Sequence, residues 1–128
     1  MEKLSASTNA LNWFEIPVTD VARAKAFYES IFDIKMEQMD MQGMQMVGFP
    51  SENPKSSGAL VKSDYHKPSK EGSIIYLNGN PDLQQVLDRI ETAGGTITMP
   101  KTAISPEIGF MAFFQDTEGN ALGLHSGK

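Results

Sequence analysis

The sequence contains no cysteine, which excludes disulfides, thiolate nucleophiles and cysteine-bound metal sites. It also has no run of about eighteen apolar residues, the length that a membrane-spanning helix needs, and it begins without the basic-then-apolar order of a secretory signal. Positive charge is scarce, since the sequence has 11 Lys and Arg residues and 16 Asp and Glu residues, which gives a net charge of −5. This balance argues against nucleic acid or an anionic membrane as a partner. We therefore expect a soluble, cytoplasmic protein that binds a small molecule.

The pattern of the first third predicts a strand followed by a helix. Residues 12–18, NWFEIPV, alternate between a face with Phe14 and Ile16 and a face with Trp13 and Glu15. The next stretch, TDVARAKAFYESIF, has apolar residues at helical spacing behind a capping Thr or Asp. The helix should cover the apolar face of the strand.

The same order returns in the second half. SIIYLNG predicts a strand, and NPDLQQVLDRIETAGG predicts a helix with Asn80 as its cap and Pro81 as its first residue. Three further strands are predicted after each helix. The chain therefore predicts an α+β fold in one domain, 1–128, with a first βαβββ module at about 11–63, a linker at about 64–72 and a second module at about 73–126.

Neither module can bury its apolar surface alone, so we expect the two to pack by pseudo-symmetry as a curled mixed sheet with the helices outside. The strand faces that turn away from the helices should then line a shared cavity. From the alternation of side chains along the strands, we expect five residues to point into this cavity: Trp13, Glu15, Ser73, Gly123 and His125.

Several separated segments, in order, resemble one family. WFEIPVTDVARAKAFYESIF, GMQMVGFP, GALVK, MPKT and DTEGNALGLHS together are similar to the glyoxalase/bleomycin resistance/dioxygenase group, the vicinal oxygen chelate superfamily, and especially to its branch related to lactoylglutathione lyase. The resemblance covers roughly residues 11–126 and implies paired βαβββ modules. It also implies a homodimer, which is common among its members.

Metal-dependent members of that family hold a divalent cation with His, Glu or Gln side chains from two strands of each module. The resemblance carries these positions to Trp13, to the range 59–61, to Ser73 on the first strand of the second module, and to Gly123. None of these side chains can replace an imidazole or a carboxylate. We therefore expect no metal at the usual site and no other cofactor, although Glu15 and His125, two residues further on, could contribute to a displaced site.

Each remaining candidate has two interpretations. Trp13 is either a stacking platform for a planar ligand or a plug that fills the cavity. Glu15 is either a base or a ligand's hydrogen-bond acceptor with a raised pKa, or it forms a salt bridge, for instance with Lys101, or is exposed at the rim of the sheet. His125 is either an acid, base or ligand or a solvated strand end. Met44 and Met46 either line an adaptable apolar pocket or fill the core. His66 lies in a polar connection that we expect to be exposed, with a role in a lid as the alternative.

The first functional hypothesis is a glyoxalase-related protein that binds a small molecule between its modules, as bleomycin resistance proteins do. The second is a lyase, isomerase or dioxygenase-type enzyme with Glu15 as base, or with a divalent metal held unconventionally by Glu15 and His125. The third is a partner-binding module whose cavity Trp13 fills. The sequence does not identify a substrate.

Overall fold

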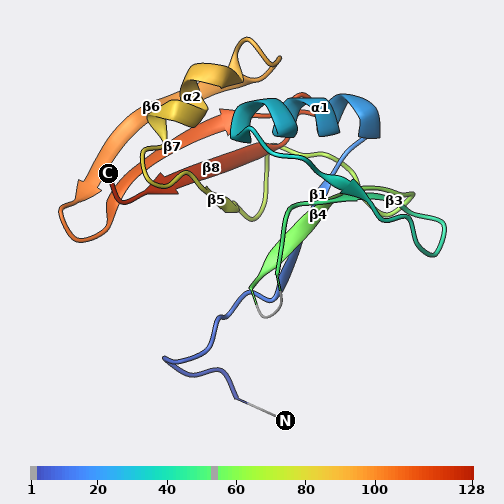
Figure 1. Cartoon of the computed structure of the whole chain (residues 1–128), viewed down its shortest axis with the longest axis horizontal. Coiled ribbons are helices and arrows are strands. Elements are labelled where there is room, and N and C mark those ends of the chain that lie inside the picture. Colours follow the sequence, from blue (N-terminus) through green and yellow to red (C-terminus); the bar gives the residue numbers. More distant parts are fainter. Residues whose placement is uncertain (1–2, 53–54) are drawn as a thin grey trace.

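The computed structural model describes residues 3–52 and 55–128, which form two open four-stranded sheets with two helices on one side of them (Figure 1). The elements are β1 Trp13–Pro17, α1 Val21–Phe32, β2 Glu37–Gln38, β3 Gln45–Gly48, β4 Ser57–Lys62, β5 Tyr76–Asn78, α2 Gln84–Ile90, β6 Thr96–Ser105, β7 Gly109–Gln115 and β8 Ala121–Ser126. The strand orders β1-β4-β3-β2 and β5-β8-β7-β6 repeat one another, with β1 parallel to β4 and β5 parallel to β8. The predicted α+β fold of two βαβββ units is confirmed.

The two helices begin in different ways. Asp20 caps α1 as expected, because its side chain accepts a hydrogen bond from the backbone N–H of Arg23 at 3.0 Å. The predicted start of α2 at Asn80 and Pro81 is wrong, since the helix begins at Gln84. The backbone N–H of Leu83 donates instead to the Ser126 hydroxyl at 3.0 Å, which ties the residues before α2 to the end of β8.

One core joins the two units. Both helices pack on the same side of the sheets and contact each other (Figure 1). The largest buried side chains come from both halves of the chain and include Phe27, Tyr28, Ile31, Leu60, Leu83, Ile90, Phe114 and Leu124. No helix within the described residues is long and apolar enough to cross a membrane.

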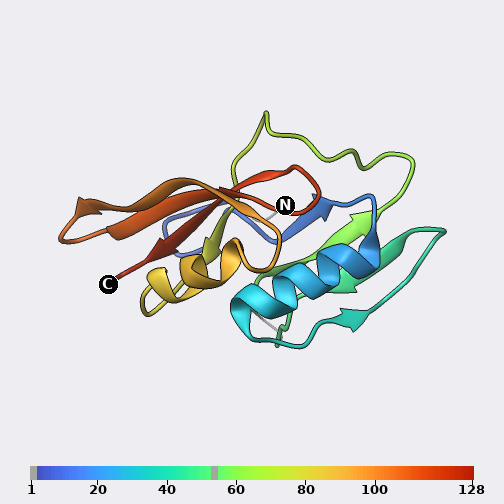
Figure 2. The same cartoon turned by 90° about the horizontal axis from the view of Figure 1, so that it is seen from above.

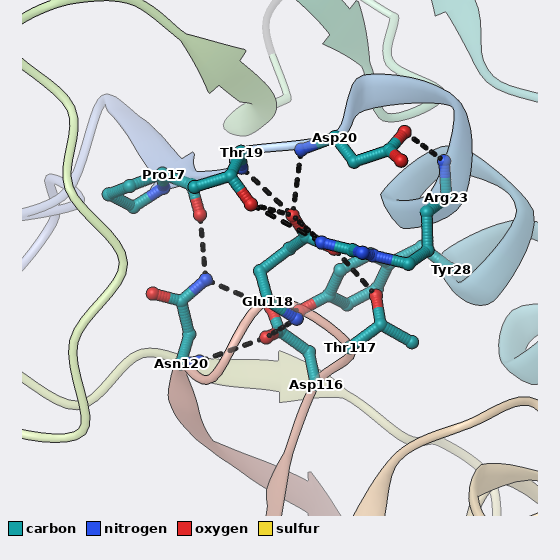
Figure 3. A network of polar contacts seen from close by, with 9 residues as sticks. All are labelled: Pro17, Thr19, Asp20, Arg23, Tyr28, Asp116, Thr117, Glu118 and Asn120. Atoms are coloured by element: carbon teal, nitrogen blue, oxygen red, sulfur yellow. Dashed lines mark hydrogen bonds and ion pairs between the residues drawn. The ribbon is translucent and has the colours of Figure 1, made fainter.

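The turn between β7 and β8, residues 116–120, reaches across to the start of α1 (Figure 3). The Glu118 side chain is fully buried there and accepts hydrogen bonds from the backbone N–H groups of Thr19 at 2.8 Å and Asp20 at 2.9 Å. The Arg23 guanidinium donates to its other oxygen at 2.7 Å. Burial acts to raise the pKa of Glu118, but the hydrogen bonds from Arg23 and the two amides outweigh it and lower the pKa from 4.5 to about 2.

Asp116 and Asn120 complete this contact, which we call the 116–120 clamp. The buried Tyr28 hydroxyl of α1 donates to Asp116 at 2.7 Å. The Asn120 side-chain amide donates to the carbonyl of Pro17, the last residue of β1, at 2.7 Å. The clamp therefore fixes the end of β1 and the start of α1 against the start of β8.

Replacing Glu118 with glutamine should destabilise the fold. We expect Glu118→Gln to lower the free energy of unfolding at pH 7 by about 3–4 kcal/mol, at about 1.4 kcal/mol for each pKa unit between 4.5 and about 2. Because the pKa is lower in the folded state, the contribution of Glu118 is fully present above pH 4.5 and disappears as the pH falls through about 2. Urea unfolding between pH 7 and pH 2.5 measures the difference.

The exposed Glu107, in the turn between β6 and β7, provides the matched control. Glu107→Gln should leave the unfolding free energy nearly unchanged at every pH. An equal loss in both variants, or a Glu118→Gln deficit that stays constant down to pH 2.5, would contradict the role assigned to the buried carboxylate.

Candidate functional site

A pocket of about 240 Å³ lies between the two units. One wall is β1, a second is the start of β8, and a third is the connection that crosses from the first sheet to the second (Figure 2). Backbone hydrogen bonds from Ala121 to Ser69 and from Gly123 to Ile75 hold this connection along β8. The lining residues of this inter-unit pocket are Glu15, Ile16, Pro17, Lys67, Ser69, Glu71, Ser73, Ile75, Asn120, Ala121 and Leu122.

Glu15 projects from β1 on the face opposite the helices, because Phe14 and Ile16 on either side of it pack into the core. Its two carboxylate oxygens have different partners. One lies 2.7 Å from His66 Nε2, and the other accepts a hydrogen bond from the Trp13 indole at 3.2 Å. The hydrogen bond from His66 is the main cause of a lowered Glu15 pKa; burial raises the pKa, and the bond from Trp13 lowers it further. The raised pKa considered for Glu15 is therefore wrong, and the carboxylate is ionised at neutral pH.

His66 is the residue that the sequence did not reveal. Its side chain is only 18% exposed, so the expectation of an exposed histidine is wrong. The turn that follows β4 brings it back beside β1, and the Ser63 hydroxyl lies 2.6 Å from His66 Nδ1. Because a carboxylate only accepts, Nε2 carries the proton that His66 donates to Glu15. The sequence placed His66 in a polar connection and carried no signal that it would lie beside Glu15.

Lys101, the partner considered for Glu15, lies elsewhere. Its ammonium group is 2.8 Å from an Asp82 carboxylate oxygen and 4.4 Å from the centre of the Phe110 ring. It thus joins β6 to the residues before α2 and takes no part in the chemistry around Glu15.

The positions to which the resemblance carries the family's metal ligands hold other residue types here. On β1, Trp13 presents an indole, which has no lone pair for a metal. On β4, the residues 59–61 are fully buried aliphatic side chains. Among residues 3–52 and 55–128, no three His, Asp or Glu side chains gather as a metal-binding group. The residues that the resemblance sets at these positions are therefore not the His, Glu or Gln ligands of the metal-dependent members.

In the second unit the Tyr76 ring lies against Gly123. The register sets Tyr76 of β5 opposite Gly123 of β8, as it sets Glu15 opposite Ala59 in the first unit. A Cβ atom on Gly123 would lie 2.5 Å from the Tyr76 ring, so the ring covers the backbone from which a ligand side chain would project. Ser73 lies before β5 and not within it, so its predicted place on that strand is wrong, although it does line the inter-unit pocket.

The remaining predicted site residues lie apart from Glu15. His125 lines a different hollow, of about 430 Å³, that includes Tyr76 and Met111, and its Nε2 lies 2.6 Å from the Ile108 carbonyl. Met46 is buried and packs with Met44 on the first sheet. The structure therefore brings Trp13, Glu15 and Ser73 to or beside the inter-unit pocket, and it places His125 and the two methionines elsewhere. The roles of all of them stay predictions.

The fluorescence of Trp13, the only tryptophan, should report the protonation of Glu15. We expect an acid titration midpoint below 4.5, the ordinary pKa of glutamate, because the hydrogen bond from His66 stabilises the carboxylate. In His66→Gln the midpoint should rise toward the ordinary value. In His125→Gln, the matched control, it should not move. Equal midpoints in the wild type and His66→Gln would show that the pair does not set this pKa.

The substitution Gly123→Ala tests whether the Tyr76 ring packs directly against Gly123. We expect Gly123→Ala to cost about 1–3 kcal/mol of unfolding free energy, because the new Cβ overlaps the Tyr76 ring. The cost should shrink in a Tyr76→Ser background. Gly127→Ala is the control, since its Cβ would have no neighbour closer than 3.8 Å. A Gly123→Ala cost that Tyr76→Ser does not reduce would argue against this packing.

Comparisons with known proteins agree with this architecture. Over 115 residues the chain is 29% identical to a glyoxylase-like domain-containing protein from Didymella fabae, covering 86% of this chain and 88% of that protein. A V278E mutant of glyoxalase I from Zea mays superposes with a TM-score of 0.70 at 18% identity, over 91% of this chain but only 45% of the maize chain. TnmS3, an antibiotic-binding protein from Streptomyces sp. CB03234, superposes with a TM-score of 0.60 at 21% identity, over 95% of this chain and 98% of its own.

These two structural likenesses show the fold alone. The family follows from the sequence model that matches residues 10–124, nearly the whole of the paired βαβββ units. The chain belongs to the glyoxalase/bleomycin resistance protein/dioxygenase superfamily.

Proposed function

We propose that this protein binds a small organic molecule in the inter-unit pocket through side-chain contacts, without a metal ion at the family's usual positions. The observation that carries the proposal is the Glu15 carboxylate, which lines the pocket and is kept ionised by His66. Glu71 adds a second acidic residue to the lining against one basic residue, Lys67, and Ile75 and Leu122 add apolar residues. This combination favours a ligand with a cationic group on an apolar body.

The same carboxylate is less well suited to abstract a proton. A general base works best when its pKa lies near the working pH, and the pKa of Glu15 is shifted the other way. The lyase, isomerase or dioxygenase-type alternative with Glu15 as base is therefore less well supported than binding. The likeness to TnmS3, described as an antibiotic-binding protein, gives modest support to the same choice.

Pairing of two chains as a homodimer is part of this proposal. It is supported by the family resemblance and by large apolar side chains of the second unit that are exposed in the single chain, Tyr76, Ile104 and Ile108. Sedimentation velocity distinguishes the dimer from the monomer, and a monomer at all concentrations would reject it.

Three probes that share one carbon skeleton test the preference of the pocket for a cation. We expect benzylamine, cationic at pH 7, to bind more tightly than benzyl alcohol or benzoate, because two acidic residues, Glu15 and Glu71, line the pocket against one basic residue, Lys67. Amide chemical-shift titrations give the dissociation constants and should locate the changes at Ile75 and Leu122. Glu15→Gln should remove the preference for the amine.

Glu107→Gln, which removes an exposed carboxylate outside the pocket, should keep that preference. Equal binding of the three probes by the wild type, or an unchanged preference in Glu15→Gln, would contradict the proposed role of Glu15. Shift changes confined to the hollow beside His125 would place binding at a different site.

A further inference from the structure

The stretch MEQMDMQGMQM, residues 36–46, contains five of the eight methionines in the chain. Met36 is buried in the main core. The other four lie on or beside the hairpin that connects β2 and β3, away from the inter-unit pocket. We call these four residues the methionine face: Met39, Met41, Met44 and Met46.

The hairpin register puts all four methionines on one face. The backbone N–H of Met39 donates to the Met46 carbonyl at 2.9 Å, and Met41 and Met44 exchange two hydrogen bonds at 3.2 and 2.9 Å. Residues directly opposite one another share a face in an antiparallel pair, and so do residues two apart along a strand. The two methionine pairs are therefore neighbours on the same surface.

The side chains agree with this register. Met39 Sδ lies 2.8 Å from the position that a Cβ on Gly48 would occupy, so the sulfur covers that glycine. Met44 and Met46 pack together against Ala59 and Val61. Met41 and Met44 both line a hollow of about 400 Å³ at the tip of the hairpin.

Core packing does not account for the outer part of the methionine face. Met46 is buried, but Met39 is 36% exposed and Met41 is 49% exposed. A methionine that stays exposed contributes little hydrophobic free energy to folding. Its thioether sulfur is a soft donor, and soft donors prefer soft metal ions. Opposite Cβ atoms on paired strands lie about 5 Å apart, and each methionine has three rotatable side-chain bonds, so neighbouring sulfurs can converge on one ion.

We infer that the methionine face binds a soft monovalent metal ion, Cu(I) or its mimic Ag(I), through thioether sulfurs. The chain has no thiolate to compete for such an ion, and its net charge of −5 favours a cation. The ligands differ in kind from the oxygen and nitrogen donors of a divalent site. They also come from one hairpin of the first unit and include no residue of the inter-unit pocket.

Methionine methyl NMR tests this site on the unaltered protein. Addition of one equivalent of Ag(I) should shift the methyl signals of the methionine face and leave those of Met99 and Met111 in place. Mg²⁺, which prefers oxygen ligands, should shift none of them. Shifts at Met99 or Met111 instead, or no shift with stoichiometric Ag(I), would overturn the inference.

Competition with a chromogenic Cu(I) chelator under anaerobic, reducing conditions gives the affinity. The double variant Met41→Leu/Met44→Leu keeps the apolar volume but removes two sulfurs, and it should lose Cu(I) to the chelator at least about tenfold more readily than the wild type. Met99→Leu/Met111→Leu removes the same number of sulfurs outside the face and should match the wild type. Equal retention by the two double variants would place the ion elsewhere and reject the site.

Discussion

The burial of one carboxylate, Glu118, holds the two halves of this protein in register. A buried charge is tolerated only when hydrogen bonds replace its water, and here two backbone amides and a guanidinium from the first unit supply them. The same turn presents Asn120 to the carbonyl of Pro17, and both residues line the inter-unit pocket. The geometry of the pocket walls therefore depends on Glu118, which does not itself line the pocket.

One carboxylate on the wall of that pocket, Glu15, is paired with a histidine. The positions that carry metal ligands in the family hold an indole, buried aliphatic side chains and a glycine beneath the Tyr76 ring. Glu15, which the register sets opposite Ala59, is paired with His66 and accepts a hydrogen bond from Trp13. A fixed anionic group beside apolar walls is better suited to recognise a ligand than to exchange a proton with it.

Much of the fold was predictable because it follows from local patterns. Alternation along β1 placed Glu15 and Trp13 on the face away from the helices, and the repeated order of strands and helix predicted two equivalent units. The start of α2 was predicted wrongly, because a strand end far along the chain, at Ser126, competes for the backbone N–H of Leu83. The sequence shows that the methionines of the methionine face lie close together along the chain. Only the hairpin register shows that all four lie on one face.

The sequence by itself determined the α+β class and the two-unit repeat, since these depend on residue type and near-neighbour periodicity. Only the tertiary structure decided which partners the buried charges have. His66 is 51 residues from Glu15, and Glu118 is 99 residues from Thr19. From the sequence, His66 and Glu118 could not be distinguished from exposed polar residues of a turn. The hydrogen bonds that distinguish them form only when distant strands are packed together.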